Sequence, residues 1–347
     1  MKKLKKLILN PKNTIHDAIK NLQESEKQIV LVVKNNKFIG TINDGDIRRG
    51  ILKGISLKAS IDKIINRNPI VCNLSVSTKK LTDIMIKNNI NSIPIIDNNK
   101  KLLDLKFRYE KDLEGKKQIL NLMVIMAGGR GKRLMPYTKF SPKSLLKVSG
   151  KPIVEHIINR AKFNGYNSFI LSINHLGTLI KKEIGNGKSL NAKIRYIKEN
   201  KKLGTAGSLS LMKKILKKDF IVTNGDVITD INYSDLLNFH IENNSAATMA
   251  IRSYEIKNPY GEIKTIGNEI IDYFEKPIYR SYINTGVYAF HPKILKLLKY
   301  NKEISMIQLF KKIKQKKLKV LAYPIHEKWL DVGTPENYFS AEKFVND

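Results

Sequence analysis

A glycine-rich segment that directly follows a predicted strand is the part of this 347-residue chain best suited to phosphate chemistry. The apolar stretch Leu122–Met126 predicts a buried strand, which runs into Ala127-Gly128-Gly129-Arg130-Gly131-Lys132-Arg133. Glycines let backbone N–H groups approach phosphate oxygens closely, and the lysine and arginines add positive charge. The residue types and their position therefore favour a loop that binds a phosphorylated ligand.

Two common phosphate-binding fingerprints do not fit this loop. The dinucleotide pattern G-x-G-x-x-G would need glycine where Leu134 stands. A P-loop that ended at Gly131-Lys132 would need glycine at Met126 and serine or threonine at Arg133. The loop must belong to another type of phosphate site.

A longer motif begins in this loop and fits a different family. It runs through Arg133-Leu134-Met135-Pro136-Tyr137-Thr138, Ser141-Pro142-Lys143-Ser144-Leu145-Leu146 and Gly150-Lys151-Pro152-Ile153. This string resembles the signature of the sugar-1-phosphate nucleotidyltransferases. Lys132 is a departure, because the family usually has threonine or serine there, close to the triphosphate. A cation at that position is compatible with phosphate.

The resemblance implies a role for each matching residue. The expected catalytic residues are Arg133, Lys143 and Asp226. The expected nucleotide-binding residues are Ala127, Gly128, Gly129, Gly131, Lys132, Gly204 and Thr205. The expected sugar-phosphate-binding residues are Gly261, Glu275, Lys276 and Asn284.

Two aspartates match the metal-binding aspartates of that family. Asp226 follows the apolar stretch Phe220–Thr223, and Asp331 lies within Trp329–Tyr338. The resemblance implies Mg²⁺ as the cofactor, held by both carboxylates. A sugar 1-phosphate oxygen would attack the α-phosphorus of a nucleoside triphosphate in line with departing pyrophosphate, and catalysis would come from positioning and charge compensation. The two aspartates are far apart in the sequence, so their pairing depends on the fold.

Short apolar strands alternate with helix-period segments throughout residues 120–347, which we assign to the catalytic domain. The alternation predicts an α/β fold with a mainly parallel sheet and helices on both faces, similar to a Rossmann fold. Ligands in such sheets bind at the carboxyl ends of the strands. The segments that carry the alternation are Leu122–Met126, Ile153–Asn164, Ser168–Ile173, Leu176–Glu183, Lys193–Ile197, Ala206–Leu216 and Phe220–Thr223.

A repeated pattern occupies residues 1–115, which predict a smaller α/β domain. A helix expected over Asn13–Gln23 is followed by strands at Gln28–Lys34 and Phe38–Ile42, and a similar order returns over residues 77–105. Neither copy alone can cover both faces of its small sheet. The polar stretch Glu110–Gln118 predicts a linker to the second domain.

The repeat resembles a cystathionine-β-synthase-type (CBS) domain pair. The resemblance is carried by Gly40-Thr41-Ile42-Asn43-Asp44-Gly45-Asp46-Ile47-Arg48-Arg49 and Ser92-Ile93-Pro94-Ile95-Ile96-Asp97. In that family the aspartate that matches Asp46 binds the ribose of an adenine nucleotide, which makes Asp46 the expected CBS ligand residue. Asn43 replaces the usual serine or threonine, and the second copy lacks the motif. A structural or dimerising role is therefore an equal alternative, and we expect a homo-oligomer.

The order of the two domains bears on the substrates. A CBS pair before this type of catalytic domain resembles a bacterial group that makes GDP-glucosamine for legionaminic acid and related surface sugars. The resemblance implies GTP and a glucosamine- or hexose-1-phosphate. A mannose-1-phosphate guanylyltransferase, or a uridylyl- or thymidylyltransferase, is the alternative. A catalytically inactive sensor of sugar nucleotide and adenine nucleotide is an alternative from another class.

The composition limits the remaining function classes. The chain has 63 Lys and Arg against 31 Asp and Glu, a formal net charge of +32. The lysines are spread through every segment beside abundant asparagine and isoleucine, which favours compositional bias over a nucleic-acid partner. Cys72 is the single cysteine, and the apolar part of Met1–Asn10 is too short for a signal peptide. We expect a cytoplasmic protein without a membrane span or a specific nucleic-acid partner.

Overall fold

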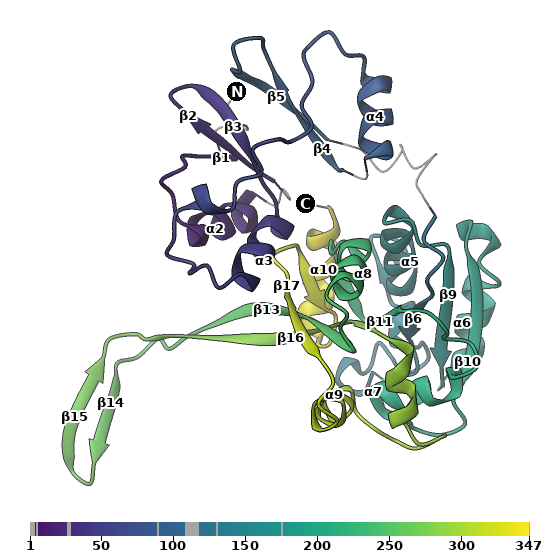
Figure 1. The fold of residues 1–347 in the computed structure, drawn as a ribbon. Helices are drawn as coiled ribbons and strands as arrows, with labels where there is room; N and C mark the ends of the chain where they lie inside the picture. Colours follow the sequence, from purple (N-terminus) through teal and green to yellow (C-terminus); the bar gives the residue numbers. More distant parts are fainter. Residues whose placement is uncertain are drawn as a thin grey trace.

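The computed structural model describes residues 4, 6–25, 29–88, 90–107, 118–129, 131–174 and 176–346. The predicted linker Glu110–Gln118 lies outside the described residues except for Gln118. Two small sheets form the N-terminal region, and a seven-stranded sheet forms the centre of the C-terminal region (Figure 1). The predicted α/β architecture, with a mainly parallel sheet after a smaller α/β region, is confirmed.

The central sheet has the spatial order β10-β9-β6-β11-β16-β13-β17. Its strands are β6 (Met123–Met126), β9 (Ser168–Ile173), β10 (Lys193–Lys198), β11 (Phe220–Asn224), β13 (Ala247–Lys257), β16 (Ile278–Phe290) and β17 (Val320–Pro324). Neighbouring strands are parallel except where β16 pairs antiparallel with β11 and with β13. The carboxyl ends of β6, β9, β10 and β11 therefore meet at one edge of the sheet.

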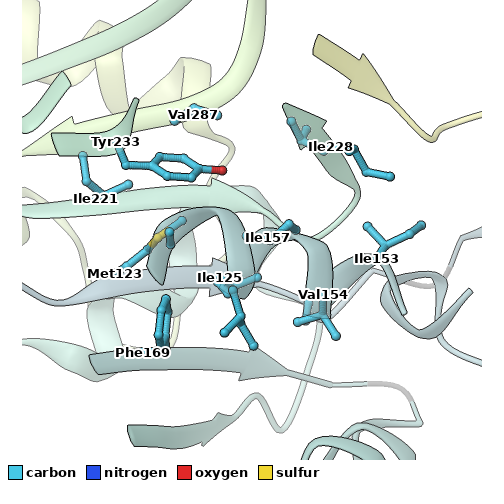
Figure 2. Packing of buried hydrophobic residues seen from close by; sticks show 14 of the residues in the cluster. Met123, Ile125, Ile153, Val154, Ile157, Phe169, Ile221, Ile228, Tyr233 and Val287 are labelled. Carbon is cyan, nitrogen blue, oxygen red and sulfur yellow. The ribbon is translucent and has the colours of Figure 1, made fainter. Parts of the chain in front are cut away.

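Helices cover both faces of this sheet. Successive side chains of each strand point to opposite faces, and both faces are apolar, so each needs a covering layer. Met123 and Ile125 of β6 pack into one core cluster, while Val124 packs into the other. Figure 2 shows the first cluster, in which Ile153 and Ile157 from a helix pack near the strand residues. The helices are α5 (Ile153–Phe163), α6 (Gly177–Ile184), α7 (Gly204–Gly207), α8 (Tyr233–Glu242), α9 (Met306–Gln315) and α10 (Pro335–Asn346).

The helix predicted over Ala206–Leu216 differs from the structure. The segment forms the short α7 and then a 3-10 helix at Ser208–Met212. Its glycines and serines disfavour a longer α-helix. The carbonyl oxygen of Lys302 would also lie 2.6 Å from a Cβ added at Gly207, so the chain packs closely there.

In the described part of the C-terminal region, three two-stranded sheets lie outside the central sheet. They are formed by β7 (Lys147–Val148) with β8 (Lys151–Pro152), β12 (Val227–Thr229) with β18 (Trp329–Asp331), and β14 (Glu262–Ile266) with β15 (Glu269–Phe274). The last pair lies at the end of a long hairpin that projects away from the rest of the molecule (Figure 1). Among the described residues, no helix is both long and apolar enough to cross a bilayer.

The N-terminal region contains two unequal copies of a small α/β unit. Its elements are β1 (Ile8–Leu9), α2 (Ile15–Ser25), β2 (Val30–Lys34), β3 (Lys37–Ile42), α3 (Asp44–Leu52), α4 (Thr78–Lys87), β4 (Ser92–Ile96) and β5 (Leu102–Phe107). A three-stranded sheet, β1-β2-β3, belongs to the first copy, and β4-β5 to the second. Apolar side chains of α2, β2 and α3 form the core of the first copy.

Arg48 on α3 joins this region to the C-terminal region. Its guanidinium carbon lies 3.3 Å from the ring centroid of Tyr323, and its Nε donates a hydrogen bond to the carbonyl oxygen of Pro324 at 2.9 Å. It also forms an ion pair with Asp44 and lies 3.9 Å from Glu327. Because Arg48 is only 5% exposed, these contacts are shielded from water.

We expect Arg48→Ala to lower the free energy of unfolding by about 3–5 kcal/mol, because it leaves buried carboxylates without their cation. Arg67 in the same region is the matched control, since its side chain and that of its ion-pair partner Asp62 are each 52% exposed. Arg67→Ala should cost less than about 1 kcal/mol. Urea denaturation of both full-length variants makes the measurement. Equal decreases in the free energy of unfolding for the two variants would contradict the special role of Arg48.

Candidate active site

The candidate site lies where the strand order of the central sheet reverses. The chain passes from β6 to β9 and β10 on one side of the sheet and to β11 on the other, so the β6/β11 boundary is the switch point at which α/β sheets bind ligands. The Gly225 N–H donates to the Met126 carbonyl at 3.0 Å. A Cβ at Gly225 would lie 2.8 Å from that oxygen. This close approach places Asp226 beside the start of the glycine-rich loop.

Asp226 and Asp331 come together through the pairing of β12 with β18. Val227 is the register partner of Asp331, and the Val332 N–H donates to the Asp226 carbonyl at 2.9 Å. This antiparallel pairing joins segments that are far apart in the sequence. The pairing therefore places the carboxylates of Asp226 and Asp331 next to each other, as the sequence prediction of a shared site required.

Lys143 reaches the same two carboxylates. Its Nζ donates to Asp226 Oδ2 at 2.5 Å and lies 3.6 Å from Asp331 Oδ1. Lys143 is 9% exposed and begins a 3-10 helix after Pro142. Gly131, at φ +62°, packs close by, since a Cβ there would lie 3.3 Å from the Lys143 Cβ and 2.8 Å from Thr138 Cγ2. The glycine-rich loop and Lys143 therefore form one packed unit.

The carboxylate pair lacks full charge compensation. Burial raises the pKa of Asp331, and the nearby charge of Asp226 raises it further, against the opposing charges of Lys143 and Arg133. Arg133 is exposed and lies on the 3-10 helix at Lys132–Leu134, which follows the glycine-rich loop. The cluster therefore favours additional positive charge.

The residues present fit a divalent cation. The Oδ1 atoms of Asp226 and Asp331 are buried and have no hydrogen-bond partner within the described part of the chain. Carboxylate oxygens are suitable ligands for Mg²⁺, which usually takes one or two carboxylates and completes its shell with water and substrate phosphates. The described residues contain no group of three or more His, Cys, Asp or Glu side chains arranged to hold a metal. The two carboxylates of Asp226 and Asp331 match the small number of protein ligands that Mg²⁺ usually takes.

We expect Asp331→Asn to raise the free energy of unfolding at neutral pH in the absence of Mg²⁺. The folded protein raises the pKa of Asp331 above the ordinary pKa of an aspartate. The stability that this group contributes is therefore lost as the pH rises from the ordinary pKa through the raised pKa. Asparagine removes the cost of the ionised carboxylate. Urea denaturation at neutral pH, with and without Mg²⁺, measures the effect.

The same experiment examines the metal site. Mg²⁺ should stabilise the wild-type chain and should stabilise the Asp331→Asn variant much less, because one ligand is lost. Glu183→Gln, on the exposed face of α6, is the control and should respond to Mg²⁺ as the wild type does. A variant that is less stable than the wild type without Mg²⁺ would refute the assigned electrostatics.

The glycine-rich loop has one tight and one open position. A Cβ at Gly128 would lie 3.1 Å from Glu199 Oε1 and 3.2 Å from the Asn174 Cβ, whereas a Cβ at Gly129 would meet no atom within 4 Å. Ala127 is buried. Lys132 lies on the exposed 3-10 helix that follows the loop. Their assignment to nucleotide binding remains a prediction.

Glu199 is a buried carboxylate at this edge that the sequence reasoning missed. It directly follows β10 and accepts a hydrogen bond from Ser172 Oγ at 2.8 Å. Burial raises its pKa. Its position could have been found from the sequence, because a carboxylate directly after a strand of a parallel sheet lies at the ligand-binding edge, as Asp226 does.

Gly204 and Thr205 support the packing of two helices. Gly204 has φ +70°, and a Cβ there would lie 2.6 Å from the Ile304 carbonyl oxygen. The Met306 N–H donates to Thr205 Oγ1 at 2.7 Å, which holds the start of α9 against α7. These contacts define a structural role, and nucleotide binding by the pair stays a prediction.

The four predicted sugar-phosphate residues fall into two places. Asn284 lies on β16, where its Nδ2 donates to the Tyr288 hydroxyl at 2.8 Å. Burial raises the pKa of Tyr288 to about 12, and the charge of Asp226 contributes, so this pair is near the carboxylates. Gly261, Glu275 and Lys276 lie instead on the projecting hairpin and are exposed. The structure does not bring these three together with Lys143.

Asp46 has local partners in the N-terminal region. Its N–H and carboxylate form a capping box with Asn43 at the start of α3, and Arg49 pairs with the carboxylate at 2.6 Å. A cavity of about 570 Å³ nearby is lined by both CBS copies and by α8. Its lining includes Asn43, Asp44 and Asn91. A role for Asp46 in ligand binding remains a prediction.

A doubly wound sheet with a glycine-rich loop, a buried lysine and paired aspartates at its switch point is typical of α/β proteins that bind phosphorylated ligands. A family model described as "Nucleotidyl transferase" matches residues 122–347, and one described as "CBS domain" matches residues 3–53 and 61–105. The chain belongs to the nucleotidyl transferase family and carries an N-terminal CBS pair.

Curated relatives match about 62% of this chain. The mannose-1-phosphate guanylyltransferase catalytic subunit beta of Drosophila melanogaster is 30% identical over 224 residues, which cover 62% of this chain and 60% of that protein. The mannose-1-phosphate guanyltransferase of Yarrowia lipolytica is 31% identical over 229 residues, 62% of each chain. The match therefore spans about 60% of the length of these relatives.

A solved structure has a similar fold. HddC from Yersinia pseudotuberculosis is 25% identical and has a TM-score of 0.52, with 65% of this chain and 99% of that chain covered. A structure of the same protein complexed with GMP-PN gives the same TM-score at 24% identity.

Proposed function

We propose that this protein transfers a nucleotidyl group from a nucleoside triphosphate to a sugar 1-phosphate and releases pyrophosphate. The observation that carries the proposal is the contact of Lys143 with both Asp226 and Asp331 beside the glycine-rich loop. With a divalent cation on the two carboxylates, this arrangement could compensate the charge of a triphosphate at a ligand-binding edge of the sheet.

The proposed reaction needs no covalent intermediate. A sugar-phosphate oxygen forms a bond to the α-phosphorus, while the bond from that phosphorus to the pyrophosphate oxygen breaks. Lys143 and Arg133 stabilise the charge on the α-phosphate, and the glycine-rich loop orients the phosphates. Mg²⁺, when held by Asp226 and Asp331, would neutralise negative charge on the triphosphate.

We propose GTP as the donor. The support comes from the curated relatives that are 30–31% identical, since the names of both contain mannose-1-phosphate and guanyl transfer. The CBS pair before the catalytic domain resembles the group that makes GDP-glucosamine for legionaminic acid, which supports glucosamine 1-phosphate beside mannose 1-phosphate as acceptor. We place the enzyme in the cytoplasm because nucleoside triphosphates are available there.

The test is pyrophosphate release with Mg²⁺ from GTP, CTP, UTP, dTTP and ATP, each against glucosamine-, mannose- and glucose-1-phosphate. One pair well above the others would support the reaction and name the substrates. Preference for UTP or dTTP would support the alternative specificities. Nucleotide binding without turnover across the panel would favour the inactive sensor.

An adenine nucleotide is the proposed ligand of the CBS pair. The cavity between the two CBS copies and α8 has about the volume of a small-molecule site. Its polar lining offers hydrogen-bonding groups such as Thr41, Asn66 and Ser92. Calorimetry with ATP, ADP and AMP tests this ligand, with GTP as the control. Heat from all four nucleotides alike would argue against an adenine-specific site.

A further inference from the structure

The projecting hairpin, here called the arm (residues 252–283), leaves the sheet without any cover. Its base continues the β13–β16 ladder from Arg252↔Ile283 to Lys257↔Ile278, and β14 pairs with β15 at its end. Nearly all of its residues are exposed, on both faces of the ribbon (Figure 1). A two-stranded ribbon alone is marginally stable in water, so the arm needs a partner surface.

The arm is apolar as well as exposed. Half of the large hydrophobic side chains that lie exposed in the described part of the chain are on it. They are Tyr254, Ile256, Tyr260, Ile263, Ile266, Ile270, Ile271, Tyr273, Phe274, Ile278, Tyr279 and Tyr282. Exposed apolar side chains gathered on one segment in this number indicate an interaction site on a protein that is otherwise strongly charged.

A second exposed apolar surface, here called the aromatic patch (Met135, Tyr137, Phe140 and Phe339), lies beside the candidate active site. The rings of Tyr137 and Phe339 are 5.7 Å apart, and Phe140 is 78% exposed. The patch joins the loop after Arg133 to helix α10. On that helix, Asn337 Nδ2 donates to the Asp331 carbonyl at 2.8 Å. A segment docked on the patch would therefore lie next to the paired aspartates.

We infer that the arm docks on the aromatic patch of a second copy of this chain and places Lys276 and Glu275 at the partner's active site. The inference rests on the proposed function, which assigns these residues to the sugar phosphate. In a two-fold dimer, each copy would dock its arm on the other copy. Both arms would then be occupied, and the assembly would be complete with two chains. The site of one chain, which holds Lys143, Asp226 and Asp331, would then be completed by the other.

A second copy fits the arm better than the catalytic domain that carries it. Bending the base of the arm back toward its own sheet would disrupt the continuous pairs of β13 with β16 and the Arg280–Glu255 ion pair, whose atoms are 2.7 Å apart. Docking in a dimer preserves this ladder. Two such apolar arms can bury on the order of 2,000 Å², which reaches the size of stable interfaces.

The test combines two variants that should each be inactive. Asp226→Asn removes a central carboxylate, and Lys276→Ala removes the arm cation. In a mixed dimer, the Lys276→Ala chain supplies an intact centre and the Asp226→Asn chain supplies an intact arm, so one site of the two works. Random mixing by co-expression should recover about a quarter of the wild-type activity.

Sedimentation of matched tyrosine variants tests the arm without any use of activity. Tyr273 on the arm is 76% exposed and Tyr300, outside the arm, is 75% exposed. Tyr273→Asp should convert a wild-type dimer into monomers, and Tyr300→Asp should not. A monomeric wild type, or a Tyr273→Asp chain that stays dimeric, would overturn the inference.

The outcomes separate the inference from the function on which it rests. An active wild type, two inactive variants and an inactive mixture would overturn donation by the partner while the reaction stands. Full activity of Lys276→Ala would overturn delivery of this lysine. A wild type without activity on any substrate pair would overturn the proposed function, and sedimentation would still decide whether the arm joins two copies.

Discussion

Asp226→Asn is expected to lower kcat by about 10²–10³-fold, the usual effect of removing one electrostatic contact from a transition state. The substitution removes the carboxylate that Lys143 contacts at 2.5 Å, and it removes one of two oxygen ligands suited to Mg²⁺. The concentration of Mg²⁺ needed for half-maximal rate should also rise. Steady-state pyrophosphate release at varied Mg²⁺ measures both quantities.

Asp230→Asn is the matched control for this variant. Asp230 follows β12 on the same segment, and its side chain is 53% exposed and 3.9 Å from Arg160. It should keep turnover within a few fold of the wild type. Near-normal turnover of Asp226→Asn, in a folded protein, would show that Asp226 is no metal ligand and would remove the central support for the mechanism.

Lys143→Met is the second variant with a large expected effect. It preserves much of the buried side-chain volume but leaves two adjacent carboxylates without the cation that contacts both. Turnover should fall by about 10²–10³-fold, because the proposed mechanism assigns Lys143 to the stabilisation of charge on the α-phosphate. Lys147→Met, a substitution of an exposed lysine on β7, is the control and should retain activity.

The pH dependence distinguishes loss of charge from loss of packing at Lys143. The positive charge of Lys143 lowers the pKa of Asp331, so its removal should raise that pKa further. Asp331 then takes up a proton at a higher pH, and the acidic limb of the residual rate profile should move upward. An unchanged acidic limb would mean that Lys143 has no electrostatic influence on Asp331.

The sequence was sufficient for features that depend on local pattern. Alternating strands and helices predicted the α/β sheet, and the strand before Ala127 predicted where the glycine-rich loop begins, because burial of both sheet faces forces such patterns. The carboxylate of Glu199 was accessible by the same reasoning, since it lies two residues after the strand predicted over Lys193–Ile197. The antiparallel direction of β16 was not, because strand direction depends on the path of the connection between strands.

What the sequence by itself determined is the set of chemical groups and the strand ends that carry them: the glycines, Lys143 and Asp226. Only the tertiary structure decided that Asp331 lies beside Asp226, because the pairing of β12 with β18 joins distant segments and leaves no local signal. It also decided that Lys276 lies on an exposed arm while Asn284 stays near the carboxylates. The family resemblance predicts both residues in one sugar-phosphate site. Within a single chain they are separated, because the paired strands β13 and β16 continue beyond the core and carry Lys276 away from it.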